Sequence, residues 1–317
     1  MIRRLAALLV AAVLSMPAMA QENVVRLVVA FPPGGPVDLV ARTIADELGK
    51  QLNQRVIVDN KPGANGAIAA QSVAHATADG TTLWLTSVGA VAINPVLYDK
   101  LPYDVQRDFI PVSRVVDNDE LLVVNPANPA KTATEFIANA RKAQQPVSLA
   151  SSGIGSIPHL AMEQLADVSK ANLLHVPYKG AAPAITDVMG GQVDAFFGDV
   201  PGLVAYVQAG KLRAIGIAAP KRHPLFPDLP TLAEQGLPGV DSNNWYAIFA
   251  PAKMPPQTVA RINQAIRRTL TTAAVRDKLV ASGAVPAPSS PEELTALVRQ
   301  DTDKWGRLIK AKAMKPE

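Results

Sequence analysis

The sequence predicts an α/β protein of two lobes, each an open and mostly parallel sheet flanked by helices. Short β-branched and aliphatic runs alternate with segments of helical periodicity through most of the 317 residues, as expected for open α/β sheets. Four loops rich in glycine, serine and proline each follow a predicted strand and precede a predicted helix. The 48% hydrophobic content and the absence of cysteine indicate a large packed core without disulfides.

The first strand–loop–helix unit organises the chain. Val24 to Ala30 is a predicted strand, 31–38 (Phe-Pro-Pro-Gly-Gly-Pro-Val-Asp) is a turn, and apolar residues recur at helical spacing from Leu39 to Leu52. The first N–H groups of a helix have no partner within it, and the helix dipole is positive there. Because glycines let an anion approach the backbone closely, this loop is predicted to hold a small carboxylate.

The N-terminal part of the first lobe continues this alternation of strands, loops and helices. After a turn-rich stretch at 59–66, the small residues Ser87 to Ala90 form a second loop between a predicted strand and a helix. The segment 101–111 is expected to be an irregular surface connection. The other predicted elements are a strand at 55–58, a small-residue helix through Ala76, a strand at 82–86 and, later in the chain, a strand at 245–250 and helices at 256–270, to about 282 and at 291–310.

The second lobe is predicted to begin where Asp117-Asn-Asp-Glu120 separates two apolar runs. Thr132 and Glu135 fit a capping box at a helix start. Further strands are expected at 147–150, 173–176, 193–197 and 212–219, the last returning the chain, with helices after 151–156 and 177–183 and from 201 to 208. The expected domains are a first lobe of 21–118 plus 221–317 and a second lobe of 119–220, with a ligand cleft between them.

Residues 1–20 have the features of a signal peptide. Arg3 and Arg4 are the basic region, Leu5 to Leu14 the apolar region, and 18–20 an Ala-Met-Ala cleavage site. The apolar run is short for a membrane span, so an exported protein cleaved after Ala20 is expected. The net charge of +4 includes no basic run or aromatic-interleaved patch, which disfavours nucleic acid as a partner.

The four loops at 31–38, 86–90, 151–156 and 177–183 offer glycines, hydroxyls and backbone N–H groups. If two loops of each lobe meet across a cleft, they form a cage of donors for carboxylate oxygens. Each hydrogen bond to a charged group contributes roughly 1.5–3 kcal/mol, and a micromolar ligand needs about 8 kcal/mol. The predicted ligand-binding residues are Phe31, Gly34, Gly35, Pro36, Val37, Asp38, Ser87, Val88, Ser152, Gly155, Ser156, Tyr178, Lys179, Gly180, Gly198 and Asp199.

Two interpretations stay open for several of these side chains. Asp38 either caps its helix or receives an amino or hydroxyl group of the ligand, and Asp199 either caps the helix at 201–208 or bonds the ligand. Lys179 either neutralises a carboxylate or is solvated. Tyr178 and Phe31 either wall the pocket or belong to the core.

The sequence offers little for catalysis. The histidines at 75, 159, 175 and 223 show no HExxH motif or paired metal spacing. Ser156 and His159 lie three residues apart, on one helix face, without a GxSxG motif, and the lack of cysteine excludes thiol chemistry. A non-enzymatic protein without metal or cofactor is expected, and an exported α/β enzyme acting on a carboxylate is the alternative of a different class.

An ordered set of motifs gives the chain a resemblance to a known family. The motifs are Phe31-Pro-Pro-Gly-Gly-Pro-Val-Asp-Leu-Val-Ala-Arg42, Asp59-Asn-Lys-Pro-Gly-Ala-Asn-Gly66, Ala78-Asp-Gly-Thr-Thr-Leu83, Pro177-Tyr-Lys-Gly180, Gly190-Gly-Gln-Val-Asp194, Ala209-Gly-Lys-Leu-Arg213 and Leu229-Pro-Thr-Leu-Ala-Glu-Gln-Gly-Leu-Pro238. With this set the chain resembles, over its whole mature length, the Bug family of TctC-like extracytoplasmic solute receptors, the binding components of tripartite tricarboxylate transporters.

The resemblance implies a monomeric periplasmic protein of the Venus-flytrap type (type II-like) whose lobes close on a ligand. Family ligands are di- and tricarboxylates, acidic amino acids and aromatic acids, with one carboxylate held by loops that match 31–38, 151–156 and 177–180. The implied partners are the membrane subunits of a tripartite transporter or, as an alternative function, a sensory membrane kinase. Many members have Asp directly after the Val-Asp-x-x-Phe strand, whereas here Gly198 takes that place and Asp199 follows.

Overall fold

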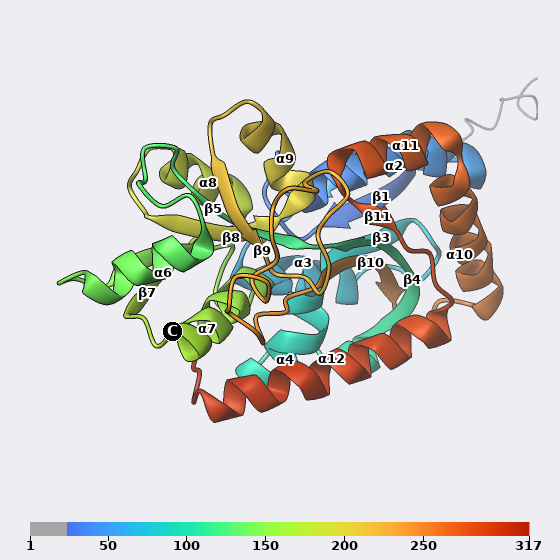
Figure 1. The fold of residues 1–317 in the computed structure, drawn as a ribbon. Helices are drawn as coiled ribbons and strands as arrows, with labels where there is room; N and C mark the ends of the chain where they lie inside the picture. The colour runs from blue at the N-terminus through green and yellow to red at the C-terminus, as the bar shows by residue number, and fades with distance from the viewer. Residues whose placement is uncertain (1–23, 317) are drawn as a thin grey trace, which may run out of the picture.

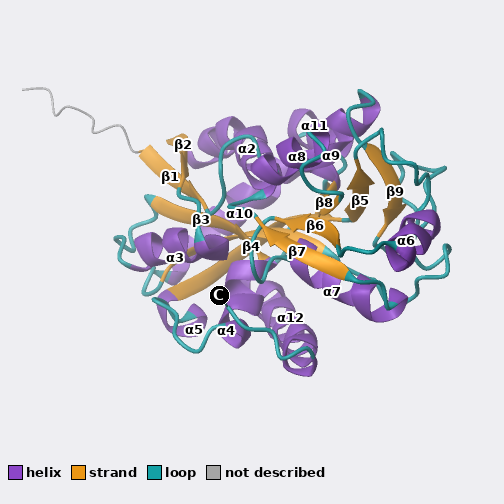
Figure 2. Ribbon diagram, turned by 90° about the vertical axis from the view of Figure 1, so that its left-hand side faces the viewer, coloured by secondary structure: helices purple, strands orange, loops and turns teal. Residues whose placement is uncertain are grey.

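Two β-sheets lie side by side and form the framework of the two lobes, with helices packed over both (Figure 1 and Figure 2). The computed structural model describes residues 24–316, and the predicted signal peptide lies outside that range. Sheet A has the strand order β11-β4-β10-β3-β1-β2, and sheet B has the order β7-β6-β8-β5-β9. Within the described residues, every helix is too short or too polar to cross a membrane.

Sheet A receives strands from both ends of the described chain. Its early elements are β1 (Val24–Val29), α2 (Pro36–Leu52), β2 (Arg55–Asn60), η1 (Ala64–Gly66), α3 (Ala67–Ala74), β3 (Thr82–Ser87), η2 (Gly89–Ile93), α4 (Asn94–Leu97), α5 (Val105–Asp108) and β4 (Phe109–Asn118). Its late elements are β10 (Asn244–Pro251), α10 (Pro256–Thr271), α11 (Ala273–Ser282), β11 (Val285–Pro286) and α12 (Pro291–Ala311).

Sheet B is built from the middle of the chain. Its elements are β5 (Glu120–Val124), α6 (Ala133–Lys142), β6 (Val147–Ser151), α7 (Ile157–Ser169), β7 (Leu173–Pro177), α8 (Ala181–Met189), β8 (Ala195–Asp199), α9 (Val200–Gln208) and β9 (Arg213–Ile217). A single residue, Asp119, separates β4 of one sheet from β5 of the other. The predicted lobe boundaries at 118/119 and 220/221 stay a prediction.

Each sheet is mixed, which refines the expectation of mostly parallel sheets. The strand–loop–helix units produce the parallel pairs, β1 with β2 and β3, and β6 with β7 and β8. The antiparallel pairs involve the strands that carry the chain between the sheets. β5 is antiparallel to β8 and β9, and β10 is antiparallel to β3 and β4.

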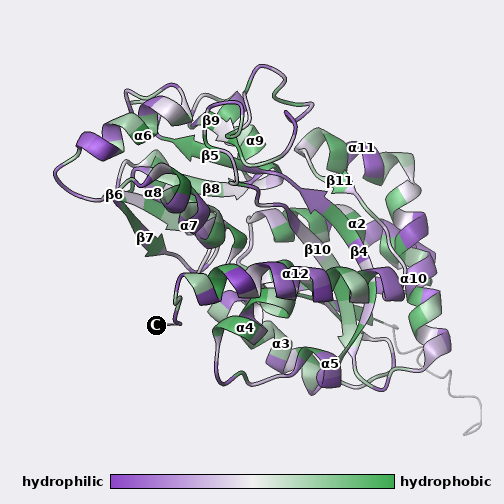
Figure 3. Ribbon diagram, turned by 60° about the horizontal axis from the view of Figure 1, so that its bottom comes forward, coloured by the Kyte–Doolittle hydropathy of each residue, from purple (hydrophilic) through white to green (hydrophobic). Residues whose placement is uncertain are grey.

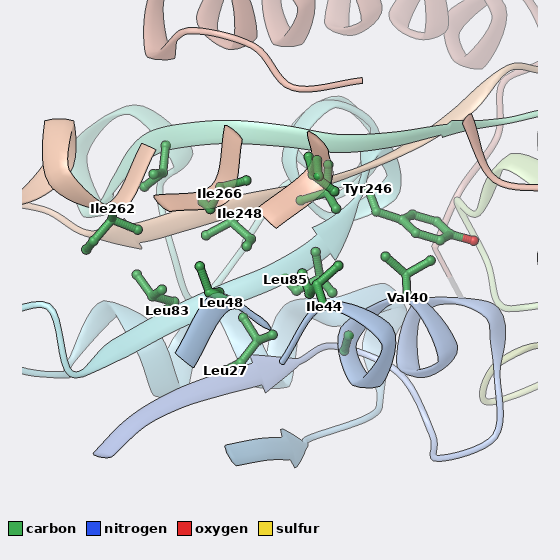
Figure 4. Packing of buried hydrophobic residues seen from close by; sticks show 14 of the residues in the cluster. Leu27, Val40, Ile44, Leu48, Leu83, Leu85, Tyr246, Ile248, Ile262 and Ile266 are labelled. Carbon is green, nitrogen blue, oxygen red and sulfur yellow. The ribbon is translucent and has the colours of Figure 1, made fainter. Parts of the chain in front are cut away.

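The core of the first lobe explains why the opening helix lies where it does. Val40, Ile44 and Leu48 recur at a spacing of four on α2, so they form one apolar stripe that packs against sheet A. Figure 4 shows this stripe facing Leu27 and Leu85 of the sheet. The C-terminal helix α12 repeats the design, because it carries both hydrophilic and hydrophobic residues (Figure 3) and buries Leu294, Trp305 and Ile309 in one apolar cluster.

Three local predictions differ from the structure. The segment 101–111 contains α5 and the start of β4 instead of an irregular connection. The strand expected at 193–197 is displaced to 195–199, so Gly198 and Asp199 close the strand itself. Thr132 caps α6, but the Glu135 carboxylate accepts from the N–H of Lys131, one residue before the cap, so the predicted capping box is incomplete.

Candidate functional site

The four predicted loops meet at the junction of the two lobes. They surround a small, partly enclosed cavity of about 20 Å³, which is enough for about one water-sized group. A more open pocket of about 190 Å³ adjoins it and shares Phe31 and Ser152 with it. The cavity is lined by Phe31, Pro32, Gly35, Pro36, Val37, Ser87, Ser152, Ser156, Ile157, Pro158, Ala181, Phe196, Gly198, Asp199, Asn244 and Tyr246.

Four helices of nine or more residues begin at this cavity: α2, α7, α8 and α9. On α2 the N–H groups of Val37 and Asp38 precede the first helical hydrogen bond, and no described side chain caps them. The same holds for Ala181 and Ala182 on α8. Ser156 caps α7, since its Oγ accepts from the N–H of His159. The positive ends of four helix dipoles therefore converge on one small space.

The structure brings most of the predicted site residues together. The cavity takes Phe31, Gly35, Pro36, Val37, Ser87, Ser152, Ser156, Gly198 and Asp199 into its wall, and the adjoining pocket takes Phe31, Ser152, Tyr178, Lys179 and Gly180. Four predicted residues line neither space. Val88 lies in the apolar core under α12, Gly155 contacts the first lobe, and Gly34 and Asp38 face a groove on the other side of the loop.

Asp38 holds the opening loop in shape, and it is not the N-cap residue of α2, which is Gly35. Its carboxylate accepts from the N–H of Gly34 at 2.9 Å, from Arg42 Nε at 2.9 Å and from Asn60 Nδ2 at 2.9 Å. Burial raises the pKa of Asp38, but the hydrogen bonds from Arg42 and Gly34 outweigh it and lower the pKa below its usual value. The carboxylate is therefore ionised, and its hydrogen bonds hold the loop.

Two stacked histidines support the loop at 151–156 from behind. The rings of His159 on α7 and His175 on β7 lie 3.7 Å apart and are nearly parallel. His159 Nδ1 accepts from the N–H of Gly155 at 3.1 Å, and His175 Nε2 lies 2.6 Å from Ser151 Oγ. Ser151 is fully buried, outside the wall of both spaces, so the serine–histidine pair positions the loop and offers no accessible nucleophile.

This histidine stack makes stability pH-dependent. Burial lowers the pKa of His159 to about 3 and that of His175 to about 4. An unfolded histidine protonates near 6.5, so the unfolded state binds more protons between about pH 6.5 and 4, and this stability is lost as the pH falls. As the pH falls, the free energy of unfolding should therefore decrease less steeply in His159→Asn than in the wild type. We expect the two slopes to differ by about 1 kcal/mol per pH unit.

Urea unfolding at pH 7, 6 and 5 measures this difference. His75→Asn is the matched control, because His75 is exposed on the surface and its replacement should leave the slope unchanged. Equal slopes in the wild type and His159→Asn would show that the stack does not resist protonation.

The two lobes also touch each other directly beside the pocket. Asn65 Nδ2 donates to the carbonyl oxygen of Gly155 at 2.8 Å and to Asn94 Oδ1 at 3.0 Å. A Cβ atom placed on Gly180 would lie 2.5 Å from Cδ of Pro32, so the backbone of the second lobe packs against the proline ring of the first. Glycine is required at 180 for a second reason, since its φ is +119°.

The described wall of the cavity carries one acidic side chain, Asp199. Asp199 accepts from Asn244 Nδ2 at 2.9 Å and from the Tyr246 hydroxyl at 2.5 Å, and it makes no side-chain cap at α9. Figure 4 shows the Tyr246 hydroxyl directed away from the apolar cluster in which its ring packs. Burial raises the pKa of Asp199 to about 6. Its cross-strand neighbour is Glu120, a second carboxyl that the sequence analysis did not select.

Sequence reasoning missed four polar residues at this junction: Asn65, Glu120, Asn244 and Tyr246. Glu120 gave a local signal, because it is a charged residue at the head of the otherwise apolar strand Glu120–Val124. Asn65 lies within the turn-rich motif at 59–66, but its partner Gly155 is 90 residues away in the chain. Tyr246 belonged to the predicted strand at 245–250 and Asn244 preceded it, and neither position gave a signal of a site.

Two lobes built on separate sheets, with helix N-termini converging on the space between them, define the class of solute-binding proteins. The family model of the tripartite tricarboxylate transporter family receptor matches residues 40–314. The chain belongs to this family, which confirms the resemblance drawn from its motifs.

Sequence relatives and solved structures match this chain over most of its length. The protein BugT of Bordetella pertussis is 33% identical over 287 residues, 90% of this chain and 88% of BugT. MatC of Rhodopseudomonas palustris, solved with bound malate, has a TM-score of 0.85 and 34% identity, covering 90% of this chain and 98% of MatC. Rpa4515 of R. palustris, solved with adipate, has a TM-score of 0.89 and 32% identity, covering 92% and 98%.

Proposed function

We propose that this receptor captures a small carboxylate between its lobes and delivers it to the membrane subunits of a tripartite tricarboxylate-type transporter. The observation that carries the proposal is the convergence of four helix N-termini on one cavity. Backbone N–H groups at a helix start favour an anion because they point at it and add the positive end of the dipole. The described lining of this cavity has no Lys or Arg, so backbone and hydroxyl donors do this work.

The proposed binding residues divide between the two spaces. One carboxylate is placed among Gly35, Val37, Ser156 and Ala181, where the first turns of three helices meet. The body of the ligand is placed in the adjoining pocket of about 190 Å³, which Lys179 and the backbone of 63–66 line. Lys179 is exposed and serves there as a mobile counter-charge. Malate in MatC and adipate in Rpa4515 support a small dicarboxylate or related acid as the ligand.

Closure is proposed to be a rotation of the lobe of 119–220 against the lobe of 21–118 plus 221–317. The chain crosses between the sheets at Asp119 and again between β9 and β10, which limits the hinge to these segments. The contacts of Asn65 with Gly155 and of Gly180 with Pro32 belong to the closed arrangement. Export to the periplasm as a monomer, with cleavage after Ala20, completes the proposal.

Calorimetric titration of the purified protein with malate and adipate tests the proposal, with the neutral diamide of adipate as the control ligand. Binding of at least one acid at micromolar to millimolar concentration is expected, with a rise in Tm by mass action and no response to the diamide. No binding of small mono-, di- or tricarboxylates, or equal binding of the diamide, would contradict carboxylate capture. Chemical conversion of a bound acid would instead identify an enzyme.

A further inference from the structure

Glu120 and Asp199 form a buried acid pair, of which Asp199 lines the cavity. They are directly opposite each other on the antiparallel strands β5 and β8, so their side chains lie on the same face of the sheet, with Cβ atoms about 5 Å apart. Glu120 is 0% exposed and Asp199 6% exposed. Among the described residues, neither carboxyl oxygen of Glu120 has a hydrogen-bond partner, which is rare for a buried polar group.

Positive charge that could neutralise this pair lies elsewhere. In the described chain, no Lys, Arg or His forms an ion pair with either carboxyl. The ionisable group that faces both is Tyr246, whose hydroxyl donates to Asp199. The neighbouring acids face other partners: Asp119 lies near His223 and Asp241, and Asp117 pairs with Arg114 near Asp301. On α2, Asp38 pairs with Arg42.

Two adjacent carboxylates without a cation cannot both ionise at low cost in a buried site. Burial first, and then the charge of Asp199, raise the pKa of Glu120 well above its usual value. Burial raises the pKa of Asp199 to about 6, against the opposing hydrogen bonds from Tyr246 and Asn244. Two carboxyls this close favour holding one proton between them at neutral pH, and the hydrogen bonds that Asp199 accepts and Glu120 lacks favour the remaining negative charge on Asp199.

Asp199 lines the same cavity as the N-termini of α2, α7 and α8. A carboxylate held by those helices therefore shares a cavity of only about 20 Å³ with a side chain of the same charge. We propose that binding of a carboxylate in this cavity is coupled to uptake of one proton by the Glu120–Asp199 pair. The proton adds to a carboxylate oxygen of Asp199, so the charge inside the cleft stays constant. This inference rests on the proposed function. In it Glu120 is a positioning residue, which acts on the proton uptake through its neighbour Asp199.

The coupling has a direct signature in affinity. Between pH 8 and pH 7, the dissociation constant should fall by a factor approaching ten per pH unit, the limit for uptake of one proton. Titration calorimetry with malate and adipate at pH 7.5, repeated in phosphate and in Tris, counts the protons from the difference in observed heat. We expect an uptake close to one proton per ligand.

Two matched variants locate the proton. Asp199→Asn should abolish the uptake and flatten the pH dependence, with affinity at pH 8 about tenfold or more above that of the wild type, since the repelling charge is gone. Asp301→Asn is the control, because Asp301 is a half-buried acid of raised pKa that lies outside the cavity wall. It should keep the full uptake.

Zero uptake or proton release in the wild type, or loss of uptake in Asp301→Asn, overturns the coupling. If Asp199→Asn does not fold, infrared spectroscopy decides between the alternatives. Ligand-free wild type at pH 7 should show the C=O band of a protonated carboxylic acid, and Glu120→Gln should lack it. A missing band overturns the proposal. Binding without uptake refutes the coupling alone, whereas failure of every carboxylate to bind refutes the proposed function and the coupling with it.

Discussion

Gly180→Ala is expected to hold the two lobes apart and to weaken carboxylate binding by about 10- to 100-fold, which corresponds to 1–3 kcal/mol of overpacking. The new Cβ atom would lie 2.5 Å from Cδ and 2.9 Å from Cγ of Pro32, and neither the proline ring nor the backbone at 180 can rotate away. A φ of +119° at this position adds backbone strain. Because Pro32 belongs to the opposite lobe, separation of the lobes relieves the clash.

Small-angle scattering and calorimetry together measure this effect. The radius of gyration of the variant in saturating ligand should stay at its ligand-free value, whereas that of the wild type should decrease. Gly210→Ala is the matched control, because Gly210 also has a positive φ, of +66°, but its Cβ would meet no atom within 4 Å. Normal binding by Gly180→Ala would mean that Gly180 and Pro32 do not meet in the liganded state.

Asp38→Ala is expected to reduce the free energy of unfolding by about 2–4 kcal/mol and to weaken ligand binding as well. The substitution removes three hydrogen bonds to a charged acceptor and leaves the N–H of Gly34 and the Asn60 amide without that partner. Since these bonds fix the loop relative to α2, the donors of Gly35 and Val37 lose their alignment. Urea unfolding measures the stability, and calorimetry with the acid that binds the wild type measures the affinity.

Asp59→Ala provides the comparison for Asp38→Ala. Asp59 also bonds an arginine, Arg26, but the Asp59 side chain is 27% exposed and that of Asp38 only 5%, and solvent-exposed pairs contribute up to about 1 kcal/mol. A loss of stability in Asp38→Ala no larger than that in Asp59→Ala would show that the loop does not depend on its buried carboxylate.

Local chemistry made most of the framework predictable. The Gly/Pro turn between a β-branched run and an amphipathic stripe fixes the order of β1, the 31–38 loop and α2, and the same pattern recurs at 151–156 and 177–183. These signals act over a few residues, so one sequence contains them. The resemblance in the motifs then identified the family, and the matching family model confirms it.

Contacts between distant residues were beyond the reach of that reasoning. His159 and His175 looked like isolated histidines, and their stacking depends on how α7 lies against β7. Asp38 was correctly placed beside a helix start, but its bond to Asn60 depends on the pairing of β1 with β2. The mixed character of the sheets likewise depends on where β5 and β10 insert, which no local pattern encodes.

The hydrogen bonds at the Asp119 crossing bear on how reproducibly the two lobes can return to one closed arrangement. The carbonyl oxygen of Asp119 accepts from the N–H of Val200, and that of Glu120 accepts from the N–H of Ala218, so neighbouring segments are pinned to the crossing strand. The proposed rotation of the lobes therefore has few backbone dihedral angles available to it. We expect the lobes to follow nearly the same path at each closure, so that the donors of both lobes return to the same mutual alignment.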